Sequence, residues 1–532
     1  MRSLPAGKMI QARLALEDIR IGKPVGTALR EHSWNEAPLH KSALVAAYQQ
    51  LIESGELEPD EALLAVIRLK PVRTLSGVTT VTVLTKPYPC PGKCIFCPDD
   101  VRMPKSYLPD EPGAMRALEH DFDPCKQVQA RLEALSAVGH PTDKVELLIL
   151  GGTFSSYRRD YQEWFVSQCF QAMNEVPCVP PFPGKKGNED DRIAQSHLVN
   201  ESAAHRNVGL VVETRPDEIT PDELAWLRSL GVTKIQMGVQ SLDDSILELN
   251  QRGHTVADAH RAVALLRAAG FKIVLHWMPN LLGATPESDR LDFPRLWEGL
   301  CPDEIKIYPT QLLENTPLHD IWKRGEYVPY TTGELVDLIA DVKPSIPRYC
   351  RVNRIIRDIP STHVISGNKR TSLRQDVQVE MNRRGTYCDC IRCREVRGEK
   401  VRPASLRIDD LVYHPDGAEE HFLSFVTPGD HIAGFLRLSL PGADSPDTGL
   451  ADLEGAAIIR EVHIYGQSLG VGREQSGAAQ HVGLGTRLLV EADNLARKNG
   501  YRRMAVIAAV GSRGYYLERG FKRGKLYLVK GV

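Results

Sequence analysis

Six of the eleven cysteines stand in two tight groups, an arrangement typical of metal sites. The first group is Cys90, Cys94 and Cys97, spaced C-x3-C-x2-C. Three thiolates can bind three irons of a 4Fe–4S cluster and leave the fourth iron open to a ligand that is not protein. A tetrahedral zinc ion would need a fourth side chain nearby, and the motif contains none. The group therefore predicts a 4Fe–4S cluster, with a structural zinc as the alternative.

The second group is Cys388, Cys390 and Cys393. Three unligated thiols so close together would be prone to oxidation, so we interpret them as a structural zinc site with one ligand from outside the group. His363 and Cys350 are candidates for that fourth ligand, and His363 is preferred. Unligated thiols are the alternative. Other cysteines stand alone and are expected to be buried structural residues: Cys125, Cys169, Cys178 and Cys301.

Glycines and charged residues follow two of the predicted strands. In Gly151, Gly152 and Thr153, glycine allows a ligand to approach the backbone closely. Glu213 and Arg215 place a carboxylate and a guanidinium at the end of the next strand, where they could bind polar groups of a ligand. An ordinary ion pair at the rim of a barrel is the alternative for these two residues.

A glycine-rich turn opens a helix in the C-terminal part of the chain, with the pattern Q-x-x-G-x-G. Free backbone N–H groups and the positive end of the helix dipole favour a pyrophosphate at such a position. The predicted binding residues are those of this turn and of the strand before it: Glu461, Val462, His463, Ile464, Gln480, Gly483, Leu484, Gly485 and Thr486.

The elements that must position these residues are parallel βα units. Short β-rich apolar runs alternate with amphipathic stretches, and we count six such runs: 79–87, 145–154, 208–216, 233–241, 271–279 and 304–310. The fold class is therefore α/β, with a partial (βα)6 TIM-like barrel whose chemistry lies at the carboxyl ends of the strands.

Length and composition indicate several domains in one globular chain. The 532 residues are too many for one core, and 42% hydrophobic with 25% charged residues is close to the globular average. We predict a helical N-terminal cap (1–75), the barrel (76–342), a basic zinc-binding linker (343–402) and a separate α+β domain (403–532). No apolar run is long enough for a membrane span, so a cytosolic protein without membrane contact is expected.

The thiol motif at the first βα loop resembles the radical S-adenosylmethionine (SAM) superfamily. The glycine-rich turn, with residues 514–521, resembles the Gcn5-related N-acetyltransferase (GNAT) family. A chain that joins the two resembles the Elongator catalytic-subunit family in its bacterial or archaeal form. The matching stretches are 70–74, 143–146, 151–154, 213–217, 238–241, 252–255, 306–310, 357–360 and 394–396.

This resemblance implies roles for single residues in the barrel. The stretch from Gly151 to Thr153 would hold the amino group of SAM, and Glu213 and Arg215 its ribose hydroxyls and carboxylate. Lys306 would hold a phosphate or a nucleobase in the cavity.

Two further roles concern acetyl-CoA. Tyr516 would lie near the thioester sulfur, with an aromatic core residue as the alternative. Lys144 would contact acetyl-CoA, with a solvated surface lysine as the alternative.

The implied activity is the synthesis of 5-carboxymethyluridine at the wobble uridine of tRNA. Carbon 5 of uracil is a poor nucleophile and an acetyl methyl is barely acidic, which makes a radical route reasonable. In the implied scheme a deoxyadenosyl radical from SAM takes hydrogen from the methyl of acetyl-CoA, and the carbon radical adds to uracil. A protein lysine acetyltransferase with the barrel as scaffold is the alternative, and a tRNA-binding assembly protein with degenerate sites is a third interpretation.

The implied partners are the tRNA anticodon stem-loop and an electron donor, with no obligate accessory subunits and a homodimer as one assembly. A net charge of −2 means that phosphates must be met by local clusters. Residues 343–402 carry fifteen Lys/Arg against six Asp/Glu. A second basic patch is expected near the N-terminus: Arg2, Lys8, Arg13, Arg20 and Lys23.

Overall fold

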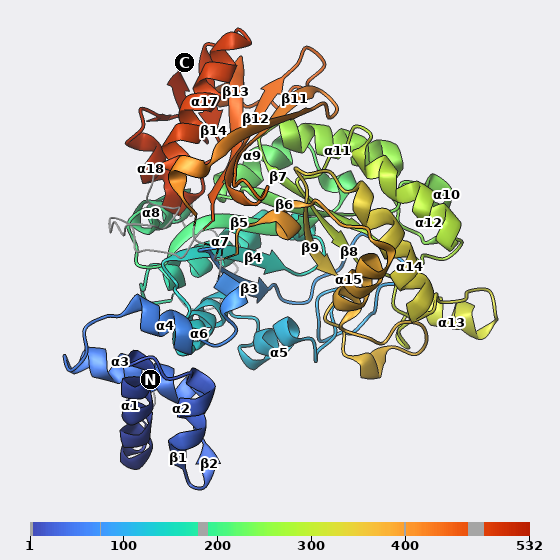
Figure 1. Cartoon of the computed structure of the whole chain (residues 1–532). Helices are drawn as coiled ribbons and strands as arrows, with labels where there is room; N and C mark the ends of the chain where they lie inside the picture. The colour runs from blue at the N-terminus through green and yellow to red at the C-terminus, as the bar shows by residue number, and fades with distance from the viewer. Residues whose placement is uncertain (1–3, 75, 179–189, 398, 400, 466–482) are drawn as a thin grey trace.

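The computed structural model describes residues 4–74, 76–178, 190–397, 399, 401–465 and 483–532. Figure 1 shows a barrel at the centre, a C-terminal domain on one side of it and a small N-terminal lobe on the other. Across these described stretches, no helix is both long and apolar enough to cross a bilayer.

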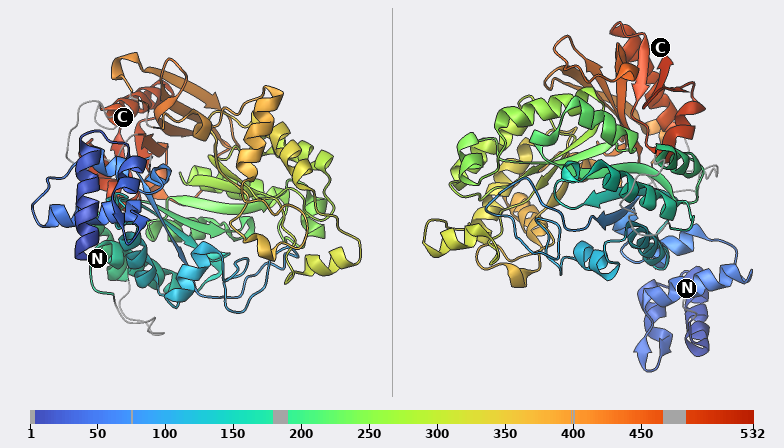
Figure 2. Two further views of the ribbon diagram at one scale, coloured as in Figure 1. Left: turned by 60° about the horizontal axis from the view of Figure 1, so that its bottom comes forward. Right: turned by 180° about the vertical axis from the view of Figure 1, so that it is seen from behind.

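The N-terminal lobe is a set of short helices with its own core. It contains α1 (Ala6–Arg20), α2 (Val25–Glu31), a small hairpin of β1 (Ser33–Trp34) and β2 (Ala37–Pro38), α3 (Lys41–Glu53) and α4 (Glu61–Ile67). Apolar side chains such as Leu16 and Leu44 are buried between α1 and α3. The lobe projects away from the barrel in Figure 1 and in the right view of Figure 2, so it does not cover the barrel as a cap would.

The barrel is a curved parallel sheet in which neighbouring strands are consecutive along the chain. All six predicted runs form strands. The strands are β3 (Thr79–Leu84), β4 (Lys144–Leu150), β5 (Arg206–Thr214), β6 (Lys234–Gln240), β7 (Lys272–Trp277), β8 (Glu304–Ile307) and β9 (Arg351–Ile355).

The seventh strand, β9, corrects the expected boundary at residue 342. It pairs in parallel with β8, so the barrel sheet continues into the segment that we assigned to a linker. The sequence of β9, RVNRI, conceals the strand because polar residues interrupt its two apolar ones.

Helices cover the outer face of the sheet (Figure 2). On β4, Val145, Leu147 and Ile149 are fully buried in the main core that these helices share with the sheet. The helices are α5 (Pro112–Glu119), α6 (Pro124–Ser136), α7 (Arg159–Met173), α8 (Asp190–Asn200), α9 (Pro221–Ser229), α10 (Asp244–Leu249), α11 (Val256–Ala268), α12 (Pro286–Asp292), α13 (Pro317–Lys323), α14 (Thr332–Val342), α15 (Leu373–Arg384) and α16 (Ile391–Arg394). Several begin at a threonine whose side chain accepts a backbone N–H, as Thr255 does for α11.

The C-terminal domain is a mixed sheet in the order β10-β11-β12-β13-β14-β16-β15. Its strands are β10 (Arg407–Tyr413), β11 (Ala418–Val426), β12 (Ile432–Pro441), β13 (Ala456–Ile464), β14 (Arg503–Val506), β15 (Lys522–Arg523) and β16 (Leu528–Gly531). The predicted hairpin is β11–β12, and the predicted helix is α17 (Leu484–Lys498), followed by α18 (Arg513–Leu517). Strands β13 and β14 are parallel, while the other pairs are antiparallel.

Buried charges join the C-terminal domain to the amino ends of the barrel strands. Asp303, just before β8, is fully buried and pairs with Arg460 of β13. Arg460 also bonds Glu420 of β11 at 2.9 Å, and Arg437 of β12 lies 3.4 Å from Asp303. Burial alone would raise the pKa of Asp303, but the arginines hold it below its ordinary value. Removing one partner of such a pair would leave a buried charge unpaired, so this interface is rigid.

Two of the cysteines expected to stand alone are bonded to each other. Cys125 in α6 forms a disulfide with Cys178, which follows α7. The pairing was not predictable, because 53 residues separate the two and no local pattern links them.

Candidate active site

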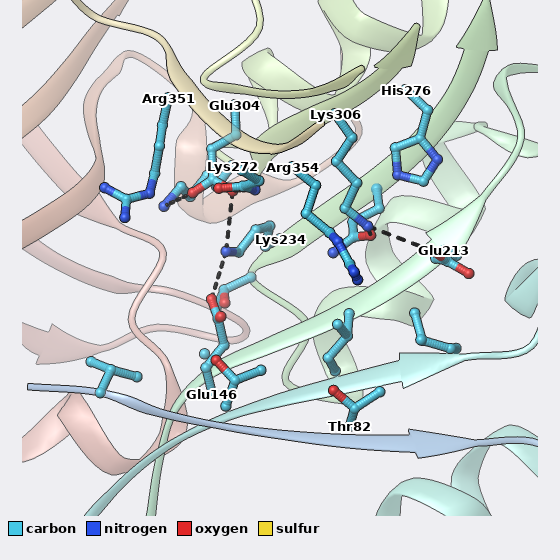
Figure 3. A pocket seen from close by; sticks show the side chains of 18 of the residues that line it. Thr82, Glu146, Glu213, Lys234, Lys272, His276, Glu304, Lys306, Arg351 and Arg354 are labelled. Atoms are coloured by element: carbon cyan, nitrogen blue, oxygen red, sulfur yellow. Dashed lines mark hydrogen bonds and ion pairs between the residues drawn. The ribbon is translucent and has the colours of Figure 1, made fainter. Parts of the chain in front are cut away.

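One continuous cavity of about 1840 Å³ runs through the barrel into the C-terminal domain. At one end it is lined by Cys90, Cys94 and Cys97, and at the other by Tyr515 and Tyr516. Between these ends it follows the interior of the barrel, which we call the lumen (Figure 3). The two sites predicted separately from sequence therefore share one space.

The lumen is lined by alternate residues of the strands. On β4, Glu146 and Leu148 line the cavity while their neighbours are buried on the opposite face. In most barrels of this kind branched apolar side chains fill the interior. Here most of the inward residues are polar: Thr82, Glu146, Glu213, Lys234, Gln236, Lys272, His276, Glu304 and Lys306. Such a lining suits a hydrated, ligand-accessible passage better than a packed core.

The loop after β3 carries the first thiol group. Cys90 Sγ accepts the backbone N–H of Gly92 at 3.4 Å and lies 3.6 Å from Thr153 Oγ1. Thr153 belongs to the glycine-rich stretch after β4, so the structure brings together the first two predicted motifs.

A guanidinium contacts the second cysteine of the group. Arg252 Nη1 donates to Cys94 Sγ at 3.4 Å. Hydrogen bonding with Cys97 and the charge of Arg252 lower the pKa of Cys94. Because the thiolate is the form that binds metal, this environment favours iron ligation.

Arg215 reaches the same loop with an unsatisfied N–H group. It bonds the carboxylate of Asp217 through Nε and Nη2, both at 2.9 Å, and donates to the carbonyl of Arg252 at 2.8 Å. Its Nη1 is buried without a partner among the described residues. A Cβ at Gly92 would lie 2.3 Å from that nitrogen, so the loop needs glycine there. The unpaired Nη1 of Arg215 suits the SAM carboxylate, which is the ligand that the resemblance assigns to this residue.

Glu213 and Lys306 face each other across the lumen (Figure 3), 4.0 Å apart. Tyr107 donates its hydroxyl to Glu213 at 2.6 Å, and Lys306 donates to Gln236. His276 Nε2, beside them, is buried without a hydrogen bond among the described residues. These groups form a polar chamber beneath the thiol loop.

The glycine-rich stretch requires glycine on steric grounds. Gly151 has φ +149°, and a Cβ there would lie 1.8 Å from Thr85 Oγ1. Gly152, with φ +88°, and Thr153 line the cavity, whereas Gly151 packs against Thr85 outside the lining.

A chain of alternating charges crosses the lumen near the C-terminal domain, and we call it the charge ladder: Glu146, Lys234, Glu304, Lys272 and Glu461 (the first four are labelled in Figure 3). Lys234 lies 2.5 Å from Glu146 and 3.5 Å from Glu304. Lys272 lies 2.6 Å from Glu304 and 2.5 Å from Glu461. Burial would lower the pKa of Lys272, but the two carboxylates raise it above its ordinary value, so the lysine stays charged.

In the C-terminal domain, β13 separates from its parallel neighbour at the cavity. Pairing with β14 runs from Ala456 to Ile459 and then stops. Beyond that point, 461–464, the strand residues predicted to bind a ligand, line the cavity. The separated strands leave room for an extended ligand along β13.

The glycine-rich turn enters α17 at the same place. Gly483, with φ +69°, precedes Leu484, the first residue of the helix, and Gly483, Gly485 and Thr486 line the cavity. A Cβ at Gly485 would lie 2.6 Å from Tyr515 Oη. Gln480 lies outside the described residues.

Tyr516 and Lys144 both line the part of the cavity next to the C-terminal domain. The Tyr516 ring packs edge-on against Tyr515 and Phe521. Burial raises the pKa of Tyr516, which keeps its hydroxyl protonated at neutral pH. Lys144 is half-buried at the start of β4, and burial lowers its pKa. Tyr516 is both a residue of the main core and part of the cavity wall, so its position agrees with either interpretation.

The second thiol group is already assembled. The sulfurs of Cys388, Cys390 and Cys393 all lie within 4.8 Å of one another, and those of Cys390 and Cys393 are 3.7 Å apart. Tetrahedral zinc with Zn–S bonds of 2.3 Å requires sulfurs about 3.8 Å apart, so the group fits zinc.

Neither candidate for the fourth zinc ligand joins this group. His363 lies elsewhere, with its Nε2 2.5 Å from the carboxylate of Asp110, so our preferred fourth ligand is wrong. Cys350 accepts the N–H of Ile391 through its backbone carbonyl, but its sulfur is not part of the group.

Much of the basic segment lines the cavity: Lys343, Arg351, Arg354, Arg357, Arg374, Arg392 and Arg397. By contrast, Arg384 is bound by carboxylates of Glu380, Asp337 and Asp341, and Arg383 is bound by Glu380. The positive charges of this segment therefore lie along the cavity wall as well as on the outer surface.

Sequence reasoning missed the charge ladder, Tyr107 and Arg252. A signal for the ladder was present, because Lys and Glu recur at every second position in KVELLIL and EIKI. Strands buried on both faces read as continuous apolar runs, so such alternation marks a polar lumen.

Comparison with known proteins agrees with this architecture. Residues 88–292 match the radical SAM superfamily, and residues 302–383 match the radical SAM C-terminal domain. A structure of archaeal Methanocaldococcus infernus Elp3 with an N-terminal deletion superposes with a TM-score of 0.72 at 34% identity, covering 86% of this chain and 99% of that one.

Named relatives are similar over most of their length. The tRNA uridine(34) acetyltransferase of Dehalococcoides mccartyi is 41% identical over 86% of this chain and 98% of its own. That of Methanocaldococcus jannaschii is 37% identical over 90% and 89%, and human Elongator complex protein 3 is 33% identical over 88% and 87%. The chain therefore belongs to the radical SAM family of tRNA uridine(34) acetyltransferases and Elongator complex protein 3.

Proposed function

We propose that the protein is a tRNA-modifying acyltransferase that uses SAM and acetyl-CoA to form 5-carboxymethyluridine at position 34. The observation that carries this proposal is the continuous cavity. It joins the three thiols of the barrel to the glycine-rich turn and Tyr516 of the C-terminal domain. An enzyme with two independent activities would have no need of a shared interior.

At the thiol end, a 4Fe–4S cluster with SAM on its open iron would supply reducing, radical-forming chemistry. Cys90, Cys94 and Cys97 would bind three irons, with Arg252 stabilising the thiolate of Cys94. Arg215 would use its unpaired Nη1 for the SAM carboxylate, and Glu213 would accept from the ribose hydroxyls.

At the other end, acetyl-CoA would lie along 461–464 with its pyrophosphate at the start of α17. The protonated hydroxyl of Tyr516 would donate a hydrogen bond to the thioester. Lys144 would pair with a phosphate at the cavity mouth.

The second thiol group would hold a zinc ion with a structural role. It lies between β9 and the C-terminal domain, because Ile391 N–H bonds the carbonyl of Cys350 and Val396 N–H bonds the carbonyl of Ile432. Zinc would thus lock the barrel sheet to the C-terminal domain.

For the tRNA we propose the anticodon stem-loop, with the wobble base unstacked and inserted at the thiol end of the lumen. Lys306 and the arginines of the cavity wall would face the base and its phosphates. An electron donor is needed to reduce the cluster. A cytosolic location, independence from accessory subunits and a homodimer stay predictions.

The test is mass spectrometry of tRNA nucleosides after incubation with anaerobically reconstituted protein, SAM, reductant and isotope-labelled acetyl-CoA. We expect labelled carboxymethyluridine at position 34. Gly485→Val should abolish it, because the side chain meets Tyr515 Oη, while Gly333→Ala, whose Cβ would make only an ordinary contact with Thr331 Oγ1 at 3.8 Å, should not. Acetylated peptide without labelled tRNA would favour the lysine acetyltransferase instead.

A further inference from the structure

The two predicted binding sites lie at opposite ends of the lumen. The predicted acetyl-CoA residues lie at the amino ends of the barrel strands, whereas the thiols lie at the carboxyl ends. Buried charges around Asp303 fix the two domains to each other, so a large domain rotation would expose unpaired charges. The reacting group must therefore cross the interior or leave the protein.

The dimensions of the lumen suit an extended chain. Lys272 and His276 both line it from β7, four residues apart, which is about 13 Å at the usual rise per residue. The pantetheine arm of coenzyme A is a flexible chain with amide groups and can span such a distance. Its amides need donors and acceptors along the way, and the lumen offers Gln236, Thr82 and the charge ladder.

The charge ladder lies at the point where an arm would enter. Lys272 bonds Glu461, which belongs to the strand predicted to hold acetyl-CoA, and Glu304, which belongs to the barrel wall. An ammonium has three N–H donors, so two carboxylates leave one donor for a neutral carbonyl oxygen.

We propose that the lumen is the route by which the acyl arm of acetyl-CoA reaches the thiol end, and that Lys272 is the positioning residue that receives its carbonyl groups at the entrance. This inference rests on the proposed function. It assigns the barrel interior as a binding site for the acyl-pantetheine arm, a role that the glycine-rich turn alone does not supply.

Plugging the lumen tests the route directly. Leu148 lines it between the ladder and the thiols and is uncharged. In Leu148→Trp the indole should block the passage, whereas Leu148→Ala should leave it open. Thr82→Trp, with Thr82→Val as its control, repeats the test from the neighbouring strand β3 if the first variant folds poorly.

Binding measurements separate the arm from the nucleotide. By calorimetry, Leu148→Trp and Lys272→Met should weaken coenzyme A at least tenfold and leave adenosine 3′,5′-bisphosphate, which lacks the arm, unchanged. Lys272→Arg should retain most of the affinity for coenzyme A. Equal affinity of all variants for coenzyme A would overturn the inference.

A second readout follows the hydrogen atom. With methyl-deuterated acetyl-CoA, wild-type protein should release 5′-deoxyadenosine that carries deuterium, since the C–D bond of the methyl breaks as the new bond at the 5′ carbon forms. Leu148→Trp should keep its iron and cleave SAM but release unlabelled 5′-deoxyadenosine. Wild-type deuterium transfer in both tryptophan variants would show that the arm takes another path. Failure of the wild type itself to modify tRNA would instead refute the proposed function.

Discussion

The two thiol groups have the same number of cysteines and differ in how far the protein has assembled them. Cys388, Cys390 and Cys393 bring their sulfurs within 4.8 Å of one another, whereas Cys90, Cys94 and Cys97 do not reach that spacing as a trio. Cys388, Cys390 and Cys393 therefore form a compact group that fits one zinc ion, and Cys90, Cys94 and Cys97 form a wider group.

The two thiol groups also differ in their surroundings. The compact group lies where backbone hydrogen bonds join the barrel to the C-terminal domain, and we propose a structural role for it. The wider group lines the cavity beside Arg215, whose Nη1 awaits a partner. The compact group lies at a junction between two domains, and the wider group lies open to the cavity.

The largest effect is expected when a cysteine of the wider group is replaced. Cys90→Ser, Cys94→Ser or Cys97→Ser should abolish iron binding after anaerobic reconstitution, together with SAM cleavage, because each cysteine supplies one iron ligand. Iron analysis and visible absorbance measure this. Cys169→Ala, at a buried cysteine outside both groups, is the control and should retain iron. Full iron content in the serine variants would show that the trio is not the ligand set.

Breaking the compact group should cost stability before activity. Cys390→Ser should release zinc and lower the free energy of unfolding by several kcal/mol, since structural zinc contributes about 10–16 kcal/mol in small zinc-binding peptides. Metal analysis and thermal unfolding give the two readouts. Wild-type protein that purifies without zinc would end this interpretation.

A smaller effect is expected at Arg252, which touches only the wider group. Arg252→Met removes the hydrogen bond to Cys94 Sγ, and hydrogen bonds to charged groups contribute about 1.5–3 kcal/mol. We expect cluster retention to fall roughly 10–100-fold during chelator challenge while zinc content stays constant. Arg324→Met, at an exposed arginine paired with Glu326, should change neither metal. Loss of zinc in Arg252→Met would mean that the two sites are not independent.

The smallest effect is expected at His363. Because its imidazole pairs with Asp110 and lies outside the compact group, His363→Ala should leave zinc content unchanged and shift thermal stability by about 1 kcal/mol or less. Equal loss of zinc in His363→Ala and Cys390→Ser would restore the histidine as fourth ligand.

The fold could be read from sequence where local pattern dominates. Apolar runs such as VELLIL and the helix ending at Gly500 predicted their elements within a few residues. Strand β9 escaped because its arginines line a polar lumen, a property of the closed barrel and not of the segment.

In the candidate site, too, features that are local in sequence were predicted and features assembled by the tertiary fold were not. Each motif was visible because its residues are close in sequence, as in the C-x3-C-x2-C run. The charge ladder takes residues from β4, β6, β7, β8 and β13, so only the tertiary fold brings them together. The His363 error has this origin too, since sequence proximity says little about a ligand from outside a group.

The arginines that face Asp303 make the C-terminal domain a poor candidate for transplantation. Arg437 and Arg460 are buried against a carboxylate that belongs to the barrel. Grafted onto another protein, this face would lose Asp303, and the two guanidinium groups would keep only their partners within the domain, Glu461 and Glu420. A barrel without the domain would in turn leave Asp303 without either arginine.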